Sequence, residues 1–114
     1  VRKNPIVYSF NKGLDYCADL NPDLIKETKF NEPLINWHSF DGEEALYAMK
    51  ESNGSAHNVS DQEMKSMSKY LLNKESKSIL PASTAGLIGL LKQHEKNEIE
   101  PDRYVAILTA KNSK

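Results

Sequence analysis

One stretch, residues 80–109, limits the fold more than any other part of this 114-residue chain. Pro81 suits a first helical turn, where its missing N–H would be unpaired anyway. Ser83 and Thr84 can offer oxygens to the free amides of that turn. The following residues are small or apolar, with glycines at 86 and 89 that cost about 1 kcal/mol each in a helix interior. A helix is therefore expected here, and close approach of another backbone would offset its glycines.

The end of this stretch is a nearly continuous apolar run, Tyr104-Val105-Ala106-Ile107-Leu108-Thr109. Such a run is typical of a strand covered on both faces. The predicted strand ends at Thr109, and ligands of α/β sheets collect at the carboxyl ends of strands. Thr109 is therefore the candidate site residue, although a threonine is also an ordinary strand former.

Local signals place further helices along the chain. Asp41 with Glu44, and Ser60 with Glu63, are predicted capping boxes. The second box would start a helix that ends near Lys74. Two weaker helices are expected near residues 4–13 and 14–20. Residues 24–35 are expected to be an extended, partly buried strand or a loop, and residues 55–59 to form a short strand.

The alternation of helices and strands predicts an α/β unit. Two strands are too few for a stable sheet, so the missing strands are expected upstream. We expect residues 1–114 to be one partial three-layer α/β domain, with helices packed on a small sheet.

Composition narrows the function classes. The net charge is −1, from 15 basic and 16 acidic residues, which gives no electrostatic reason to expect a nucleic acid or a membrane as partner. No apolar run approaches the length that crosses a bilayer. Cys17 is the only cysteine, so a reducing cytoplasm is the expected location. His38, His57 and His94 have no metal-ligand spacing, and no metal site is expected.

Several segments, taken in order, resemble one enzyme family. Pro81-Ala82-Ser83 followed by Val105-Ala106-Ile107-Leu108-Thr109 resembles the carboxyl-terminal part of threonine synthase and its relatives, which are pyridoxal-phosphate (PLP) enzymes of the tryptophan synthase β type. The other matching segments are residues 4–13, 27–34, 45–54 and 59–63. The resemblance covers nearly the whole chain.

The resemblance implies a role for Thr109. In those enzymes the Thr or Ser of a Leu-Thr/Ser-Gly motif hydrogen-bonds the pyridine nitrogen of PLP. The chain departs from the family motif, because Ala110 and Asn112 replace two glycines and Leu80 replaces a frequent glutamate. Lys114 falls at a lysine of the motif, but a surface lysine near a terminus describes it better.

The chain lacks two parts of a complete PLP enzyme. No lysine stands in the sequence context of a Schiff-base lysine, and the five glycines form no phosphate-binding loop. We therefore expect an inactive segment of a threonine synthase-like enzyme, whose partners are the remainder of the chain and an amino-acid substrate. Homo-oligomers are also expected. The alternatives are a truncated relative acting as a binding module, or a relative with other chemistry, such as serine/threonine dehydratase or cysteate synthase.

Overall fold

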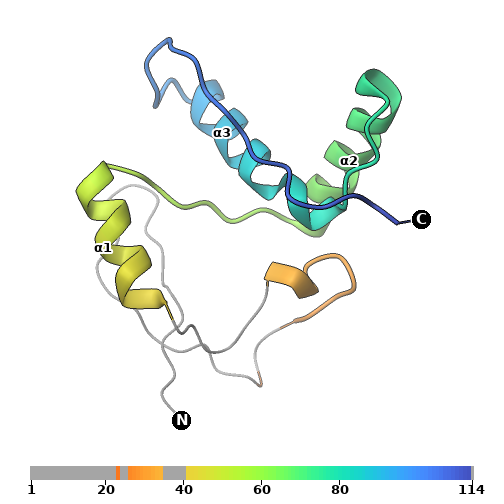
Figure 1. The fold of residues 1–114 in the computed structure, drawn as a ribbon, viewed down its shortest axis with the longest axis horizontal. Helices are drawn as coiled ribbons and strands as arrows, with labels where there is room; N and C mark the ends of the chain where they lie inside the picture. Colours follow the sequence, from red (N-terminus) through yellow and green to blue (C-terminus); the bar gives the residue numbers. More distant parts are fainter. Residues whose placement is uncertain (1–22, 24–25, 35–40, 114) are drawn as a thin grey trace. The chain divides into compact units, whose positions relative to one another are not determined.

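A computed structural model describes residues 23, 26–34 and 41–113 (Figure 1). The chain divides into two compact units, Val1–His57 and Asn58–Lys114, and each is considered by itself. The predicted helices near residues 4–13 and 14–20, together with Cys17, His38 and Lys114, lie outside the described residues. No helix within the described ranges is long and apolar enough to cross a membrane.

The first unit contains a turn, a 3-10 helix and α1. The 3-10 helix η2 spans Glu32–Leu34, within the segment expected to be an extended strand or a loop. It follows a turn in which the Asn31 N–H donates to Thr28 Oγ1 at 3.1 Å. The described residues 26–34 are therefore a loop rather than a strand, because local side-chain hydrogen bonds compete with extended backbone.

Helix α1 spans Gly42–Ser52 and has Leu46 buried. Its N-cap is Asp41, as expected, but the Asp41 side chain makes no capping hydrogen bond. The capping box predicted for Asp41 and Glu44 is therefore wrong. The helix ends at Asn53, which adopts a left-handed conformation with φ 60°, a conformation that asparagine tolerates well.

Helix α2 opens the second unit and spans Asp61–Glu75. The Ser60 capping box is confirmed: the Glu63 N–H donates to Ser60 Oγ at 3.1 Å, and the Ser60 N–H donates to Glu63 Oε1 at 2.8 Å. Two free amides of the first turn are satisfied reciprocally. Met64 and Leu71 are buried on one side of this helix.

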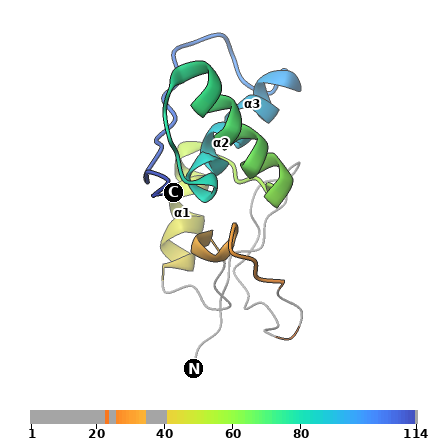
Figure 2. The ribbon, with the colours of Figure 1, turned by 90° about the vertical axis from the view of Figure 1, so that its right-hand side faces the viewer.

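The predicted helix after Pro81 forms in two steps. A 3-10 turn, η3, spans Pro81–Thr84, with Pro81 in its first turn, and α3 continues over Ala85–Glu95. Figure 2 shows α2 and α3 crossing within the second unit. The core of this unit joins all three elements through Met64, Ala82 and Ile88, with Val59, Met67, Leu80 and Ala85 packed around it.

Gly86 does not have the close neighbour that the sequence predicted. A Cβ built at Gly86 meets nothing within 4 Å, and the residue is exposed. Gly89 on the same helix is buried. The expectation of close backbone approach is therefore wrong at Gly86 in the described structure.

The predicted strand over residues 104–109 does not form among the described residues. Residues 103–110 are in no strand, and the large side chains Val105 and Ile107 are 87% and 74% exposed. The short strand expected at residues 55–59 is also absent there. The prediction that residues 104–109 are not helical is confirmed. The prediction that they are buried on both faces is wrong, because no second strand lies beside them in the described part.

The fold of the described residues is α-rich and contains no sheet. Their β-type pairing is one isolated antiparallel bridge between Ile79 and Lys111. This bridge ties the last residues of the chain to the segment before η3. The expected three-layer arrangement needs strands that these residues do not contain.

Met64 is expected to hold the second unit together. Its side chain is fully buried, and Met64→Ala should lower the free energy of unfolding by about 2–5 kcal/mol because it leaves a cavity. The control, Leu72→Ala, alters a 53% exposed side chain of the same helix and should change the free energy of unfolding by roughly 0.5 kcal/mol or less. Urea unfolding followed by circular dichroism measures both, and equal losses would contradict this core assignment.

Gly86→Ala is expected to stabilise the chain. The added methyl meets no atom, and alanine is favoured over glycine in a helix by about 0.5–1 kcal/mol. The midpoint of urea unfolding should therefore rise. Gly89→Ala adds the same methyl at a buried position and should gain less or lose stability. A loss of stability in Gly86→Ala would show that another segment lies against this glycine.

Candidate functional site

Two hydroxyls that are far apart in the sequence meet in the second unit. Ser83 lies in η3 and Thr109 lies in the extended carboxyl-terminal segment. Their oxygens, Ser83 Oγ and Thr109 Oγ1, are 3.0 Å apart, and either can be the donor. The structure thus brings together the candidate residue Thr109 and a residue of the Pro81-Ala82-Ser83 segment.

Backbone hydrogen bonds fix the position of Thr109. The Leu80 N–H donates to the Ala110 carbonyl at 3.0 Å, and the Asn112 N–H donates to the Ser78 carbonyl at 3.1 Å. These bonds flank the bridge between Ile79 and Lys111. Ala110, which follows Thr109, is therefore held against Leu80, which precedes the turn that carries Ser83.

A serine of α2 supports the same junction. Ser68 Oγ donates to the Ile79 carbonyl at 2.6 Å. Because Ile79 is the bridge partner of Lys111, this bond connects α2 to the segment that positions Thr109. Three parts of the second unit therefore position the hydroxyl pair: α2, the segment that leads into η3, and the carboxyl-terminal segment.

Ala110 and Asn112, which stand where the resembling enzymes have glycines, are compatible with the local backbone. Neither Ala110 nor Asn112 has a positive φ; the described non-glycine residues with positive φ are Asn53, Ser76 and Asn97. A left-handed conformation is what favours glycine. In this chain, the departures from the motif therefore impose no strain beside Thr109.

Thr84 and Ser83 do not cap the turn as the sequence predicted. The Thr84 side chain is fully buried, and its Oγ1 donates to the Pro81 carbonyl at 2.7 Å. No side-chain capping hydrogen bond forms at the start of η3 or α3. The Thr84 proton is thus used within the turn, while the Ser83 hydroxyl faces Thr109.

The Ser83–Thr109 hydroxyl pair can present one hydrogen-bond donor to a neighbouring group. A hydroxyl can accept and donate at once. When Ser83 donates to Thr109, the Thr109 proton is directed to another acceptor, and Thr109 is exposed. Among the described residues, Gly42 and Gly54 lie at the two ends of α1, and Gly86 and Gly89 lie within α3, so these glycines form no glycine-rich loop.

The two described histidines lie on different parts of the chain. His94 lies in the last turn of α3, where a cation complements the helix dipole. His57 Nε2 lies 3.3 Å from Ser55 Oγ in an exposed connection. In the part of the chain that the structure covers, no group of three or more His, Cys, Asp or Glu could hold a metal ion.

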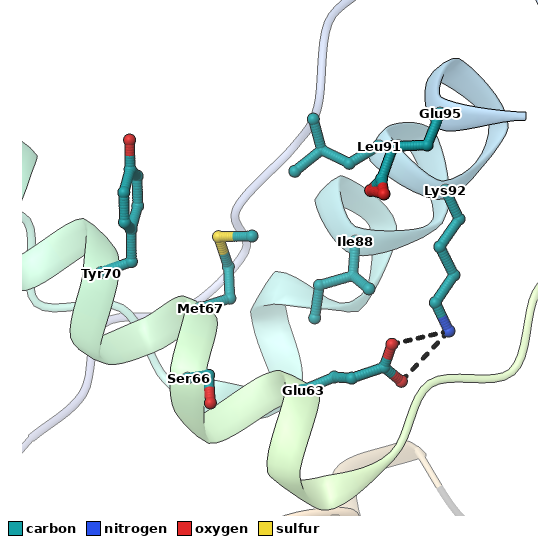
Figure 3. A pocket seen from close by; sticks show the side chains of 8 residues that line it. All are labelled: Glu63, Ser66, Met67, Tyr70, Ile88, Leu91, Lys92 and Glu95. Atoms are coloured by element: carbon teal, nitrogen blue, oxygen red, sulfur yellow. Dashed lines mark hydrogen bonds and ion pairs between the residues drawn. The ribbon is translucent and has the colours of Figure 1, made fainter. Parts of the chain in front are cut away.

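The sequence did not reveal a groove between α2 and α3. Its lining comes from positions spaced i, i+3, i+4 and i+7 on each helix, and its volume is about 360 Å³ (Figure 3). These residues are Glu63, Ser66, Met67 and Tyr70 on α2, and Ile88, Leu91, Lys92 and Glu95 on α3. Each spacing follows one face of a helix, so the signal is visible only once the two helices are known to pack together.

An ion pair joins the two helices at the groove. Lys92 Nζ lies 3.1 Å from Glu63 Oε1 and 2.9 Å from Oε2, and also donates to the Asn58 carbonyl at 3.0 Å. The Ser60 N–H and Lys92 together lower the pKa of Glu63 below its usual 4.5, partly offset by burial. The carboxylate therefore serves the cap of α2 and the contact with α3 at once.

No family model, no curated protein and no solved structure matches this chain.

The stability of the second unit is expected to fall in acid through Glu63. Since the folded state lowers this pKa, the contribution of the carboxylate is complete above about pH 4.5 and is lost as the pH falls through the folded-state value. Glu63→Gln keeps a capping side chain but does not titrate there. Urea unfolding between pH 6 and pH 3 should therefore show a smaller loss in Glu63→Gln than in the unaltered chain. Parallel pH profiles would contradict the role of Glu63.

Proposed function

We propose that this chain is the carboxyl-terminal portion of a PLP-dependent enzyme resembling threonine synthase. By resemblance, the complete enzyme converts O-phosphohomoserine and water to threonine and phosphate. Dehydratase or cysteate synthase chemistry would use the same cofactor contact. The segment provides one wall of the cofactor site through Thr109, and the upstream residues provide the Schiff-base lysine and the phosphate loop.

The contact between Ser83 and Thr109 carries this proposal. The two residues belong to two motifs of the resemblance that are 26 residues apart, and their hydroxyls lie 3.0 Å from each other. A resemblance in sequence order alone does not require this contact. This proximity supports the proposal that the two motifs contribute to the same site.

The proposed role of Thr109 follows from its chemistry. PLP, when bound, supplies an electron sink for reactions at amino acids. A neutral hydroxyl beside the ring nitrogen moderates that sink, because it donates a hydrogen bond without adding a negative charge. Ser83 orients the Thr109 hydroxyl. The Leu80 N–H donates to the Ala110 carbonyl and the Asn112 N–H donates to the Ser78 carbonyl, so the backbone that follows Thr109 is held in place.

The segment before Thr109 supports the proposed three-layer α/β domain. Exposure alternates there: Val105, Ile107 and Thr109 are exposed, whereas Ala106 and Leu108 are half-buried. Alternation with a period of two is typical of a strand that has one face packed. In the complete enzyme, upstream strands would cover the exposed side and complete the sheet.

The first test is the parent reading frame. It should encode, upstream of Val1, a Schiff-base lysine and a glycine-rich phosphate loop. If the frame begins near Val1 and no companion chain supplies these parts, the enzymatic proposal fails. The chain would then be a binding module, the alternative that the sequence left open.

The second test is Thr109→Val in the complete enzyme. Loss of one hydrogen bond, worth about 0.5–1.5 kcal/mol, should weaken PLP binding roughly 2- to 10-fold. Thr109→Ser keeps the hydroxyl and should restore most of the affinity. Lys111→Ala alters an exposed neighbour and serves as the control. Titration of the apoenzyme with PLP, followed by visible absorbance, measures all three, and equal affinities for the Val and Ser variants would contradict the role of Thr109.

A further inference from the structure

The groove between α2 and α3 has an apolar centre. Met67 from α2 and Ile88 and Leu91 from α3 line it, and Figure 3 shows their side chains directed into the space between the helices. Ile88 belongs to the buried core, whereas Leu91 is 38% exposed and Tyr70, at the edge, is 55% exposed. Enrichment in methionine and aromatic residues, together with a polar rim, is typical of protein interfaces.

The shape of the lining favours a helix as the occupant. Each wall is one face of a helix, with residues at i, i+3, i+4 and i+7. An amphipathic helix places its own apolar stripe into such a groove with the same spacing. Two helices with apolar inner faces are the ordinary partners of a third helix.

The polar groups at the groove argue against a small polar ligand. The three protons of Lys92 are directed to Asn58 and to the two oxygens of Glu63. Ser66 Oγ accepts from Gln62 Nε2 at 3.1 Å. A small-molecule site needs several polar groups that converge on the ligand, and here these groups are already bound to one another.

Glu95 favours an occupant that carries a positive charge beside its apolar stripe. The Glu63 carboxylate is neutralised by Lys92, but within the described residues the Glu95 carboxylate has no hydrogen bond and no ion pair. The lining therefore carries one uncompensated negative charge at the α3 end. A lysine or arginine beside the apolar stripe of the occupant would complement it.

We propose that this groove binds one amphipathic helix of a partner protein, with an apolar stripe against Met67, Ile88 and Leu91 and a basic residue against Glu95. The contact is separate from the Ser83–Thr109 site. It does not rest on the proposed enzymatic function.

Two synthetic helical peptides test the proposal on the 114-residue chain. Both are about 18 residues long, enough for appreciable helix formation, and carry leucines at i, i+3, i+4 and i+7. One has lysines beside the leucine stripe and the other has glutamates. Fluorescence anisotropy should show saturable binding of the lysine peptide and weaker binding of the glutamate peptide. Absence of saturable binding, or equal affinity for the two peptides, would overturn the proposal.

Variants of the chain locate the binding surface. Leu91→Glu should weaken binding of the lysine peptide by about tenfold or more, because it places a charge at the apolar centre. The matched control is Leu72→Glu, on an exposed leucine of α2 that does not line the groove, and it should leave the affinity unchanged. Equal losses in the two variants would overturn the proposal.

Glu95→Lys tests the charge without altering the apolar centre. This exposed substitution should weaken binding of the lysine peptide by roughly 2- to 5-fold and strengthen binding of the glutamate peptide. An unchanged preference would exclude the proposed role of Glu95.

Sedimentation of the chain alone tests whether a second copy of the chain occupies the groove instead. A dimer that Leu91→Glu dissociates would assign the groove to that second copy and overturn the proposal.

Discussion

One carboxylate, that of Glu63, links the start of α2 to α3 in the second unit. It accepts from the Ser60 N–H at the start of α2 and is paired with Lys92 of α3. Lys92 also donates to the carbonyl of Asn58, just before the cap. The polar cap therefore sets where α2 begins and holds α3 against it, while Met64, one residue further on, fills the core that both helices share. Glu63 and Lys92 also line the groove between the two helices.

The part of this network that is local in sequence was predictable, and the remainder was not. Ser60 and Glu63 are three residues apart, so their spacing was sufficient to predict the capping box. Lys92 is 29 residues from Glu63, and only the packing of α2 on α3 brings them together. The same spacing at Asp41 and Glu44 gave a wrong prediction, because a capping pattern permits a hydrogen bond without requiring it.

The apolar run before Thr109 shows where sequence patterns lose information. Its composition predicted an extended segment, and residues 103–110 are indeed outside any helix. Its burial depends on a neighbouring strand, which the run itself does not encode, and Val105 is 87% exposed. The position of Thr109 was easier to anticipate than its partner: Ser83 was expected to cap a helix, but its hydroxyl pairs with Thr109 instead.

The two exposed apolar surfaces of this unit require different kinds of partner. Around Val105 and Ile107 the backbone is in no helix and side-chain exposure alternates along it, so a partner can bind there through main-chain hydrogen bonds as a strand does. At the groove every wall is helical, and the backbone groups of a helix are paired within it, so a partner can bind there only through side chains. The two proposals therefore concern different surfaces of the second unit. The two proposals are consequently independent, and the failure of one leaves the physical argument for the other intact.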